Sequence, residues 1–237
     1  MFPIRDNVPR SHVPFATWLI IAMNVFVFFV ELSSPAAAVE QMTYLFGIVP
    51  ARYTHPEWAQ WVGFPSSYWP FVTSMFLHGG WLHIIGNMWM LWIFGDNVED
   101  RMGPFRFLFF YLVCGIAAAL VHLLTNVGST VPAVGASGAI AGVMAAYFLL
   151  YPRARIVAMF PIVFWPVFFE VPAFLYLGFW FFVQFFSGAA ALLSPDRVSG
   201  IAWWAHIGGF ATGVLTFWLF LRPRRPLLRR FSMGGLA

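Results

Sequence analysis

Residues 135–138, with the sequence Gly-Ala-Ser-Gly, place one hydroxyl among small residues at the start of an apolar run. Pro132 and Gly135 interrupt regular structure, so we expect a helix to begin near Ser137. The fifteen residues from Ser137 to Tyr151 reach roughly 22 Å, which is short of the roughly 30 Å hydrocarbon core of a bilayer. One helix end must therefore lie below the membrane surface. If this is the Ser137 end, its loop is buried in protein or faces a water-filled cavity, and the serine is a candidate nucleophile.

A serine becomes a nucleophile when a base lies within hydrogen-bond reach, and His206 is the candidate base. His206, Gly209 and Gly213 are spaced at i, i+3 and i+7 in the last apolar segment, so on a helix they share one face, which the glycines make into a groove. Gly138 and Gly142 form a GxxxG pair that lets a second helix approach closely, although such a pair by itself indicates only helix packing. The candidate packing glycines are Gly135, Gly138, Gly142, Gly209 and Gly213.

A second polar group consists of His83 and Asn87, which are four residues apart and would lie on one helical face. Polar side chains within membrane helices are costly and usually face the bundle interior or a cavity. Both side chains can donate hydrogen bonds. Together with the backbone N–H of Ser137 at a helix N-terminus, they are candidate donors to a developing oxyanion. We find no carboxylate at a suitable depth to orient His206, so the sequence predicts a Ser-His dyad in place of a triad.

The composition requires a membrane setting for these residues. Hydrophobic residues make up 61% of the chain and charged residues 9%, with a mean hydropathy of +0.78, whereas roughly a quarter of residues are charged in soluble domains. We expect one all-α domain over residues 1–237, a polytopic bundle of six transmembrane helices. The single cysteine, Cys114, excludes an intrachain disulfide.

Six apolar segments define the predicted spans. They cover approximately residues 14–30, 81–94, 104–124, 137–151, 167–187 and 201–221. Residues 31–73, rich in tryptophan and broken by prolines, are predicted to form a connector lying in the membrane interface. Residues 95–104 are predicted to form a charged turn, and residues 194–200 an outer loop. The first span lacks a clear cleavage site and is interpreted as retained.

Arginine supplies all the basic side chains, because the sequence contains no lysine. In the six-span topology eleven of the thirteen arginines lie on one side, and only Arg52 and Arg197 lie on the other. The positive-inside rule then places both termini in the cytoplasm. Basic residues distributed in this way indicate topology and not nucleic-acid binding. The same topology places Ser137, His206 and the His83–Asn87 pair at a similar depth, near the outer ends of their helices.

The three motifs together resemble those of rhomboid intramembrane serine proteases. Along the chain they are His-Ile-Ile-Gly-Asn at 83–87, Gly-Ala-Ser-Gly at 135–138, and Ala-His at 205–206 followed by two glycines. This is the order found in that family, and the resemblance covers residues 69–213. It implies that Ser137 is the nucleophile, that His206 is the general base and acid, and that His83 and Asn87 are oxyanion donors. It also implies a six-helix rhomboid fold. The activity it implies is cleavage of transmembrane substrates near the outer membrane surface, without a metal or other cofactor.

Other residues match the family or depart from it. His78 matches a histidine often present there, and residues 99–103 resemble the ExRxG motif; we interpret both as structural. Pro70 follows Trp69 where many members have a Trp-Arg pair, so this chain lacks that arginine as an anchor for the loop. Ala141 stands where some members place an aromatic side chain against the catalytic histidine, so the sequence leaves open how His206 is held.

Three alternatives belong to other classes. An inactive rhomboid-like protein that binds membrane clients would be expected to lack Ser137 or His206. A small transporter would be expected to show a repeated half or a buried carboxylate pair. A metalloprotease could use His78, His83, His122 and His206, but the chain has no HExxH motif and no carboxylate nearby. We therefore expect a peptide hydrolase that acts on transmembrane proteins in the lipid bilayer of a prokaryotic cytoplasmic membrane, with no nucleic-acid partner. The sequence leaves the oligomeric state and the natural substrate open.

Overall fold

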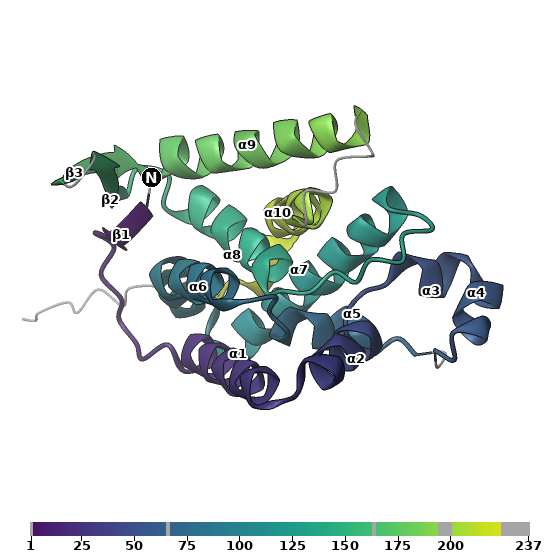
Figure 1. The fold of residues 1–237 in the computed structure, drawn as a ribbon. Coiled ribbons are helices and arrows are strands. Elements are labelled where there is room, and N and C mark those ends of the chain that lie inside the picture. The colour runs from purple at the N-terminus through teal and green to yellow at the C-terminus, as the bar shows by residue number, and fades with distance from the viewer. Residues whose placement is uncertain (1, 65–66, 163–164, 194–200, 224–237) are drawn as a thin grey trace, which may run out of the picture.

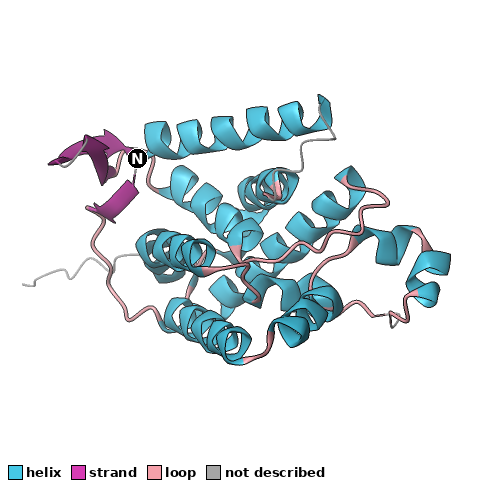
Figure 2. Cartoon of the chain, in the orientation of Figure 1, coloured by secondary structure: helices cyan, strands magenta, loops and turns pink. Residues whose placement is uncertain are grey.

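The computed structural model describes residues 2–64, 67–162, 165–193 and 201–223, and this part of the chain is mostly helical (Figures 1 and 2). The elements in chain order are β1 (Phe2–Asp6), α1 (Phe15–Ser33), α2 (Ala36–Phe46), α3 (Pro50–Thr54), α4 (Pro56–Trp61), α5 (Pro70–Thr73), the 3-10 helix η1 (Ser74–Phe76), α6 (Trp81–Met102), α7 (Pro104–Thr125), α8 (Ser137–Leu150), β2 (Arg155–Ile162), β3 (Trp165–Pro172), α9 (Ala173–Leu193) and α10 (Trp203–Phe220).

Helix α8 lies in the middle of the bundle, with α6, α7 and α10 packed around it (Figure 1). Every residue from Gly138 to Tyr147 is buried. On the α10 side the approach is backbone to backbone, since a Cβ atom on Gly209 would overlap the carbonyl oxygen of Gly138, and one on Gly213 would overlap that of Gly142. Glycine is therefore required at the contact between α8 and α10, as small residues generally are where membrane helices pack this closely.

Three of the described helices, α1, α7 and α9, are long and apolar enough to cross a membrane. Helix α8 is a shorter apolar helix; its 14 residues extend only about 21 Å, less than the roughly 30 Å hydrocarbon core. The chain is thus a multi-pass integral membrane protein. The segments predicted at 104–124, 137–151 and 201–221 coincide with α7, α8 and α10 to within two residues at either end.

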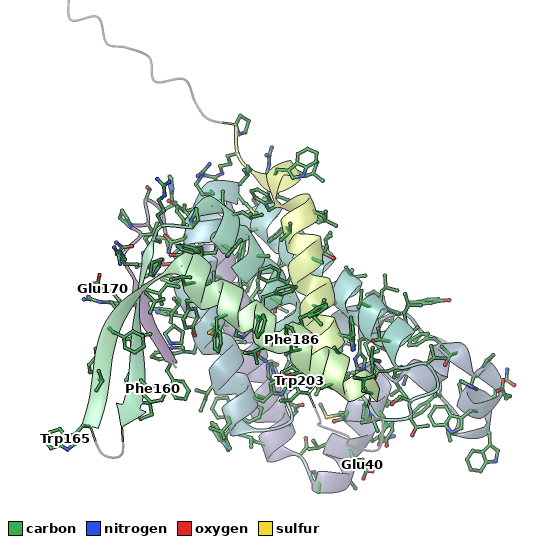
Figure 3. All side chains as sticks on the ribbon, turned by 90° about the horizontal axis from the view of Figure 1, so that it is seen from above. Glu40, Phe160, Trp165, Glu170, Phe186 and Trp203 are labelled. Carbon is green, nitrogen blue, oxygen red and sulfur yellow. The ribbon has the colours of Figure 1, made fainter. Side chains whose placement is uncertain are left out.

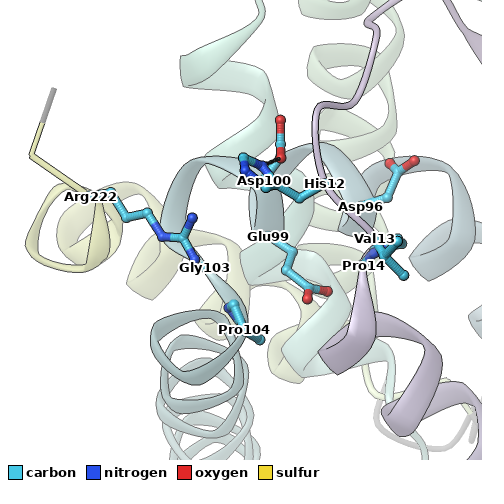
Figure 4. A pocket seen from close by; sticks show the side chains of 9 residues that line it. All are labelled: His12, Val13, Pro14, Asp96, Glu99, Asp100, Gly103, Pro104 and Arg222. Atoms are coloured by element: carbon cyan, nitrogen blue, oxygen red, sulfur yellow. Dashed lines mark hydrogen bonds and ion pairs between the residues drawn. The ribbon is translucent and has the colours of Figure 1, made fainter. Parts of the chain in front are cut away.

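The predicted charged turn over residues 95–104 is wrong, because α6 remains helical through Met102. The charged side chains in its last turns have partners outside the helix. Asp100 Oδ1 lies 2.6 Å from His12 Nδ1 (Figure 4), and Glu99 turns toward α1. Because these charged side chains form hydrogen bonds within the protein, their residues can remain helical and do not need a solvent-exposed turn.

Glu99 caps the N-terminus of α1. Its carboxylate accepts hydrogen bonds from the backbone N–H groups of Ala16 and Thr17, at 2.9 and 2.8 Å, and from the Thr17 hydroxyl at 2.7 Å. Pro14 precedes the helix and offers no capping side chain, so a carboxylate from another helix satisfies these donors and also complements the positive end of the helix dipole. Glu99 is 2% exposed, and its role in the fold is structural.

Strands β1, β2 and β3 form an antiparallel sheet in that order and depart from the predicted all-α fold. The fifth predicted span, 167–187, is accordingly wrong at its start, because residues through Pro172 belong to β3 and the helix begins at Ala173. Pro161 and Pro166, paired across the hairpin, disfavour helix but are compatible with strand edges. The β2–β3 hairpin extends away from the helices, with Trp165 near its tip (Figure 3).

Four short helices, α2 to α5, occupy most of the predicted connector over residues 31–73. Helix α1 continues into this region as far as Ser33. Glu31 in its last turn is buried, and its carboxylate accepts the backbone N–H of His78 at 3.3 Å. The predicted outer loop at 194–200 and the arginine-rich tail beyond residue 223 lie outside the described residues.

Candidate active site

Ser137 is the first residue of α8, and the turn before it depends on Gly135. Gly135 has φ +127°, which side-chain-bearing residues rarely adopt, and its N–H donates to the carbonyl oxygen of Ser74 at 2.8 Å. A Cβ atom at Gly135 would lie 2.7 Å from Cε1 and Nε2 of His83. The backbone conformation and the approach of His83 both require glycine, and together they direct the chain into α8 at Ser137.

His206 lies on α10 opposite the start of α8. Its Nε2 atom is 2.8 Å from Ser137 Oγ, which is hydrogen-bond distance. The glycine contact between the two helices explains this approach, because Gly209 is one turn beyond His206 and rests against the Gly138 carbonyl. Both side chains are half-buried. A hydroxyl that meets an imidazole nitrogen in this way can transfer its proton to the ring.

The opposite edge of the His206 ring faces α9. Gln184 Oε1 lies 2.8 Å from His206 Nδ1. The ring centroids of Trp180 and Trp203 lie 5.9 and 6.3 Å from that of the imidazole, so aromatic side chains on α9 and α10 flank the histidine, whereas Ala141 on α8 offers none. The sequence reasoning missed Gln184, although a single amide within an otherwise apolar helix was an available signal.

His83 and Asn87 lie beside the turn that leads to Ser137. Asn87 Nδ2 is 2.9 Å from His78 Nε2, and the His78 and His83 rings meet edge to face at 5.0 Å between centroids. An atom at the Cβ position of Gly135 would also lie 3.6 Å from Asn87 Nδ2. Among the described residues no hydrogen bond joins either side chain to Ser137. The structure thus places both predicted donors next to the serine's loop and not against its hydroxyl.

A cavity of about 40 Å³ opens beside Ser137. Gly115, Ala118 and His122 of α7 form one wall, and Gly135 and Ala205 contribute to others. A buried water needs roughly 10–15 Å³ of such volume together with polar partners, so this cavity can hold water next to the serine. Within the described ranges, no three His, Cys, Asp or Glu side chains are grouped as ligands for a metal ion.

Comparison with known proteins gives a consistent result. Residues 65–223 match the Rhomboid domain family. The chain is 30% identical over 169 residues to Rhomboid protein 1, mitochondrial, of Saccharomyces cerevisiae, which covers 69% of this chain and 45% of that protein. It is 30% identical over 174 residues to the Presenilin-associated rhomboid-like protein, mitochondrial, of Mus musculus, covering 68% and 41%. Rhomboid-like protein 11, chloroplastic, of Arabidopsis thaliana is 43% identical over 82 residues, covering 35% and 29%. The chain therefore matches less than half the length of each of these relatives.

Proposed function

The chain belongs to the rhomboid family, and from this membership and the geometry at Ser137 we propose that it is an intramembrane serine endopeptidase. The observation that carries the proposal is the 2.8 Å contact between Ser137 Oγ and His206 Nε2. It occurs at the N-terminus of a helix too short to span the bilayer, beside a cavity that can hold water. Together these features provide a nucleophile, a base and access for water within a membrane protein.

In the proposed reaction, Ser137 Oγ attacks the carbonyl carbon of the scissile peptide bond while His206 Nε2 accepts the hydroxyl proton. The carbonyl oxygen becomes an oxyanion, which accepts hydrogen bonds from the Ser137 backbone N–H and from His83 and Asn87. When the C–N bond breaks, His206 returns the proton to the leaving amine and an acyl-serine ester remains. A water molecule, deprotonated by His206, then attacks the ester carbon. His206 returns this proton to Ser137 Oγ as the ester C–O bond breaks, which releases the new carboxyl group and restores the serine hydroxyl.

The topology that accompanies this proposal has six crossings, formed by α1 and α6 to α10, with both termini in the cytoplasm. The uneven distribution of arginines supports it. In this orientation Ser137 lies near the outer face, and the substrates are transmembrane segments that reach the site from the bilayer. We propose the cytoplasmic membrane of a prokaryote as the location, although the relatives described above carry names that place them in mitochondria or chloroplasts.

Binding of membrane clients without cleavage is the main competing function, and the hydrogen-bonded Ser137–His206 pair favours catalysis over it. The test is labelling of the folded protein with a serine-reactive fluorophosphonate, comparing wild type, Ser137→Ala and His206→Ala. We expect labelling of the wild type alone, because an unactivated hydroxyl reacts slowly. Cleavage of a model transmembrane substrate in proteoliposomes is measured in parallel. A folded wild type that neither reacts with the probe nor cleaves the substrate contradicts the proposed function.

A further inference from the structure

We propose that Gln184 is a positioning residue that fixes the tautomer and the orientation of the His206 ring, an inference that rests on the proposed function of Ser137 and His206. The contact that motivates it joins Gln184 Oε1 on α9 to His206 Nδ1 on α10, at 2.8 Å. The other ring nitrogen, Nε2, faces Ser137 Oγ. Gln184 therefore occupies the position that a carboxylate occupies in a Ser-His-Asp triad.

The orientation of the amide follows from its second contact. Gln184 Nε2 donates to the backbone carbonyl oxygen of Trp180, one turn earlier on α9, at 3.2 Å. If the amide were flipped, two oxygens would face each other at this contact. The amide oxygen is therefore the atom at His206 Nδ1, and it can only accept a hydrogen bond. Nδ1 must then carry the proton, which leaves a lone pair on Nε2 to accept the proton of Ser137.

Burial indicates that this arrangement is specific. Gln184 is 6% exposed, whereas the adjacent Phe185 and Phe186 are 46% and 55% exposed. At this point helix α9 thus presents Phe185 and Phe186 outward and its one amide inward. Burying an amide without partners costs free energy, and the contacts to Trp180 and His206 satisfy both ends of this one.

The chemistry of an amide suits a base inside a membrane. A carboxylate in this position would bring a buried negative charge, which is costly at membrane depth. A neutral amide selects the same tautomer without that charge, although it stabilises the imidazolium less. The rings of Trp180 and Trp203 flank the imidazole, and the hydrogen bond to Gln184 fixes its rotation between them.

The experiment compares wild type with Gln184→Met, which keeps the length of the side chain but removes the acceptor, and with Gln184→Glu, which keeps an acceptor. Phe186→Leu on the exposed face of α9 is the matched control for changes in that helix. Tautomers are read from the nitrogen NMR signals of histidine-labelled protein, with His206→Ala used to assign the His206 signals. Cleavage of the model transmembrane substrate is measured on the same samples.

We expect the wild type, Phe186→Leu and Gln184→Glu to hold the proton on Nδ1, and Gln184→Met to show a mixture of tautomers. Cleavage by Gln184→Met should fall by about tenfold to a hundredfold, less than the ~10⁴-fold loss seen when a triad aspartate can no longer hold its histidine. Gln184→Glu should retain more activity than Gln184→Met, and Phe186→Leu should match the wild type.

An unchanged His206 tautomer in folded Gln184→Met overturns the inference, even if cleavage falls, because the effect would then be structural. If Gln184→Met does not fold, the same decision rests on Gln184→Glu, where loss of the Nδ1 proton overturns it. An inactive wild type would contradict the proposed function, while the NMR comparison would still decide whether Gln184 positions the ring.

Discussion

Helix α8 carries a hydroxyl near each end, and the two are held differently. Ser137 at the N-terminus is half-buried, borders a cavity and lies 2.8 Å from an imidazole nitrogen that can accept its proton. Tyr147 near the C-terminus is fully buried, and its hydroxyl donates to the carboxylate of Asp6 on β1. Asn97 of α6 donates to the same carboxylate at 2.9 Å. The first hydroxyl is placed where a proton can move, whereas the second ties a strand to two helices.

Removal of each hydroxyl is the sharpest test of this difference. Ser137→Ala should abolish cleavage, with a loss of at least ~10⁴-fold because nucleophile and base act as a unit, and it should leave the thermal unfolding midpoint close to that of wild type. Tyr147→Phe should lower the free energy of unfolding by about 1–2 kcal/mol with little change in the cleavage rate per folded molecule. Cleavage by Ser137→Ala, or destabilisation by it equal to that of Tyr147→Phe, would break the comparison.

Glu99, like Tyr147, is expected to affect folding and not chemistry. Glu99→Gln replaces the charged acceptor at the N-terminus of α1 with a neutral one, and it turns one acceptor oxygen into a donor that faces backbone N–H groups. We expect a loss of about 2–3 kcal/mol in the free energy of unfolding, typical of a lost hydrogen bond to a buried charged group. Denaturant titration in detergent measures this loss, and Glu40→Gln, the same substitution at an exposed position on α2, is the matched control. An unfolding curve identical to that of wild type would mean that Glu99 does not hold α1.

Substitution of Asn87 tests the proposed oxyanion site beside the N-terminus of α8. Asn87→Ala removes one proposed oxyanion donor, which in other serine proteases costs about 10²–10³-fold in kcat. His83 and the Ser137 backbone N–H remain, so we expect a smaller fall, about tenfold, in kcat with little change in KM. Steady-state cleavage of the model substrate separates the two constants. A matched comparison is His83→Ala alone and combined with Asn87→Ala; equal rates in all of these variants and wild type would remove both side chains from the oxyanion site.

Asp6 should give the smallest effect, and its sign depends on pH. Burial raises the pKa of the Asp6 carboxyl, against the opposing effect of its hydrogen bond from Tyr147. A raised folded-state pKa means that stability is greatest below the ordinary pKa of an aspartate and falls as pH rises through the higher, folded-state value. Asp6→Asn keeps an oxygen acceptor and removes the charge. We expect its unfolding midpoint to equal or slightly exceed that of wild type at neutral pH, and the difference to vanish at acid pH. A marked destabilisation at neutral pH would show that the charge itself strengthens this tie.

Most of the predicted site residues were identified from sequence patterns within single helices. Ser137 at a helix start, the glycines opposite it and His206 at i−3 from Gly209 all follow from local breakers and from the 3.6-residue period, which fix the face that a side chain occupies. The short reach of α8 follows from its expected number of residues multiplied by the rise per residue. Composition and arginine placement were sufficient to predict a polytopic membrane protein.

Contacts between helices and strands could be identified only from the tertiary structure. The charges of residues 96–101 suggested a turn, but α6 continues through them. The Glu99 carboxylate accepts hydrogen bonds from backbone N–H groups at the N-terminus of α1, more than eighty residues away in sequence. The three-stranded sheet depends on pairing β1 with β2, a contact that no local pattern encodes. Gln184 was visible as one amide in an apolar helix, yet its partner is 22 positions away on α10. Sequence periodicity determines which face of a helix is polar, but only the packing of the helices decides which two faces meet.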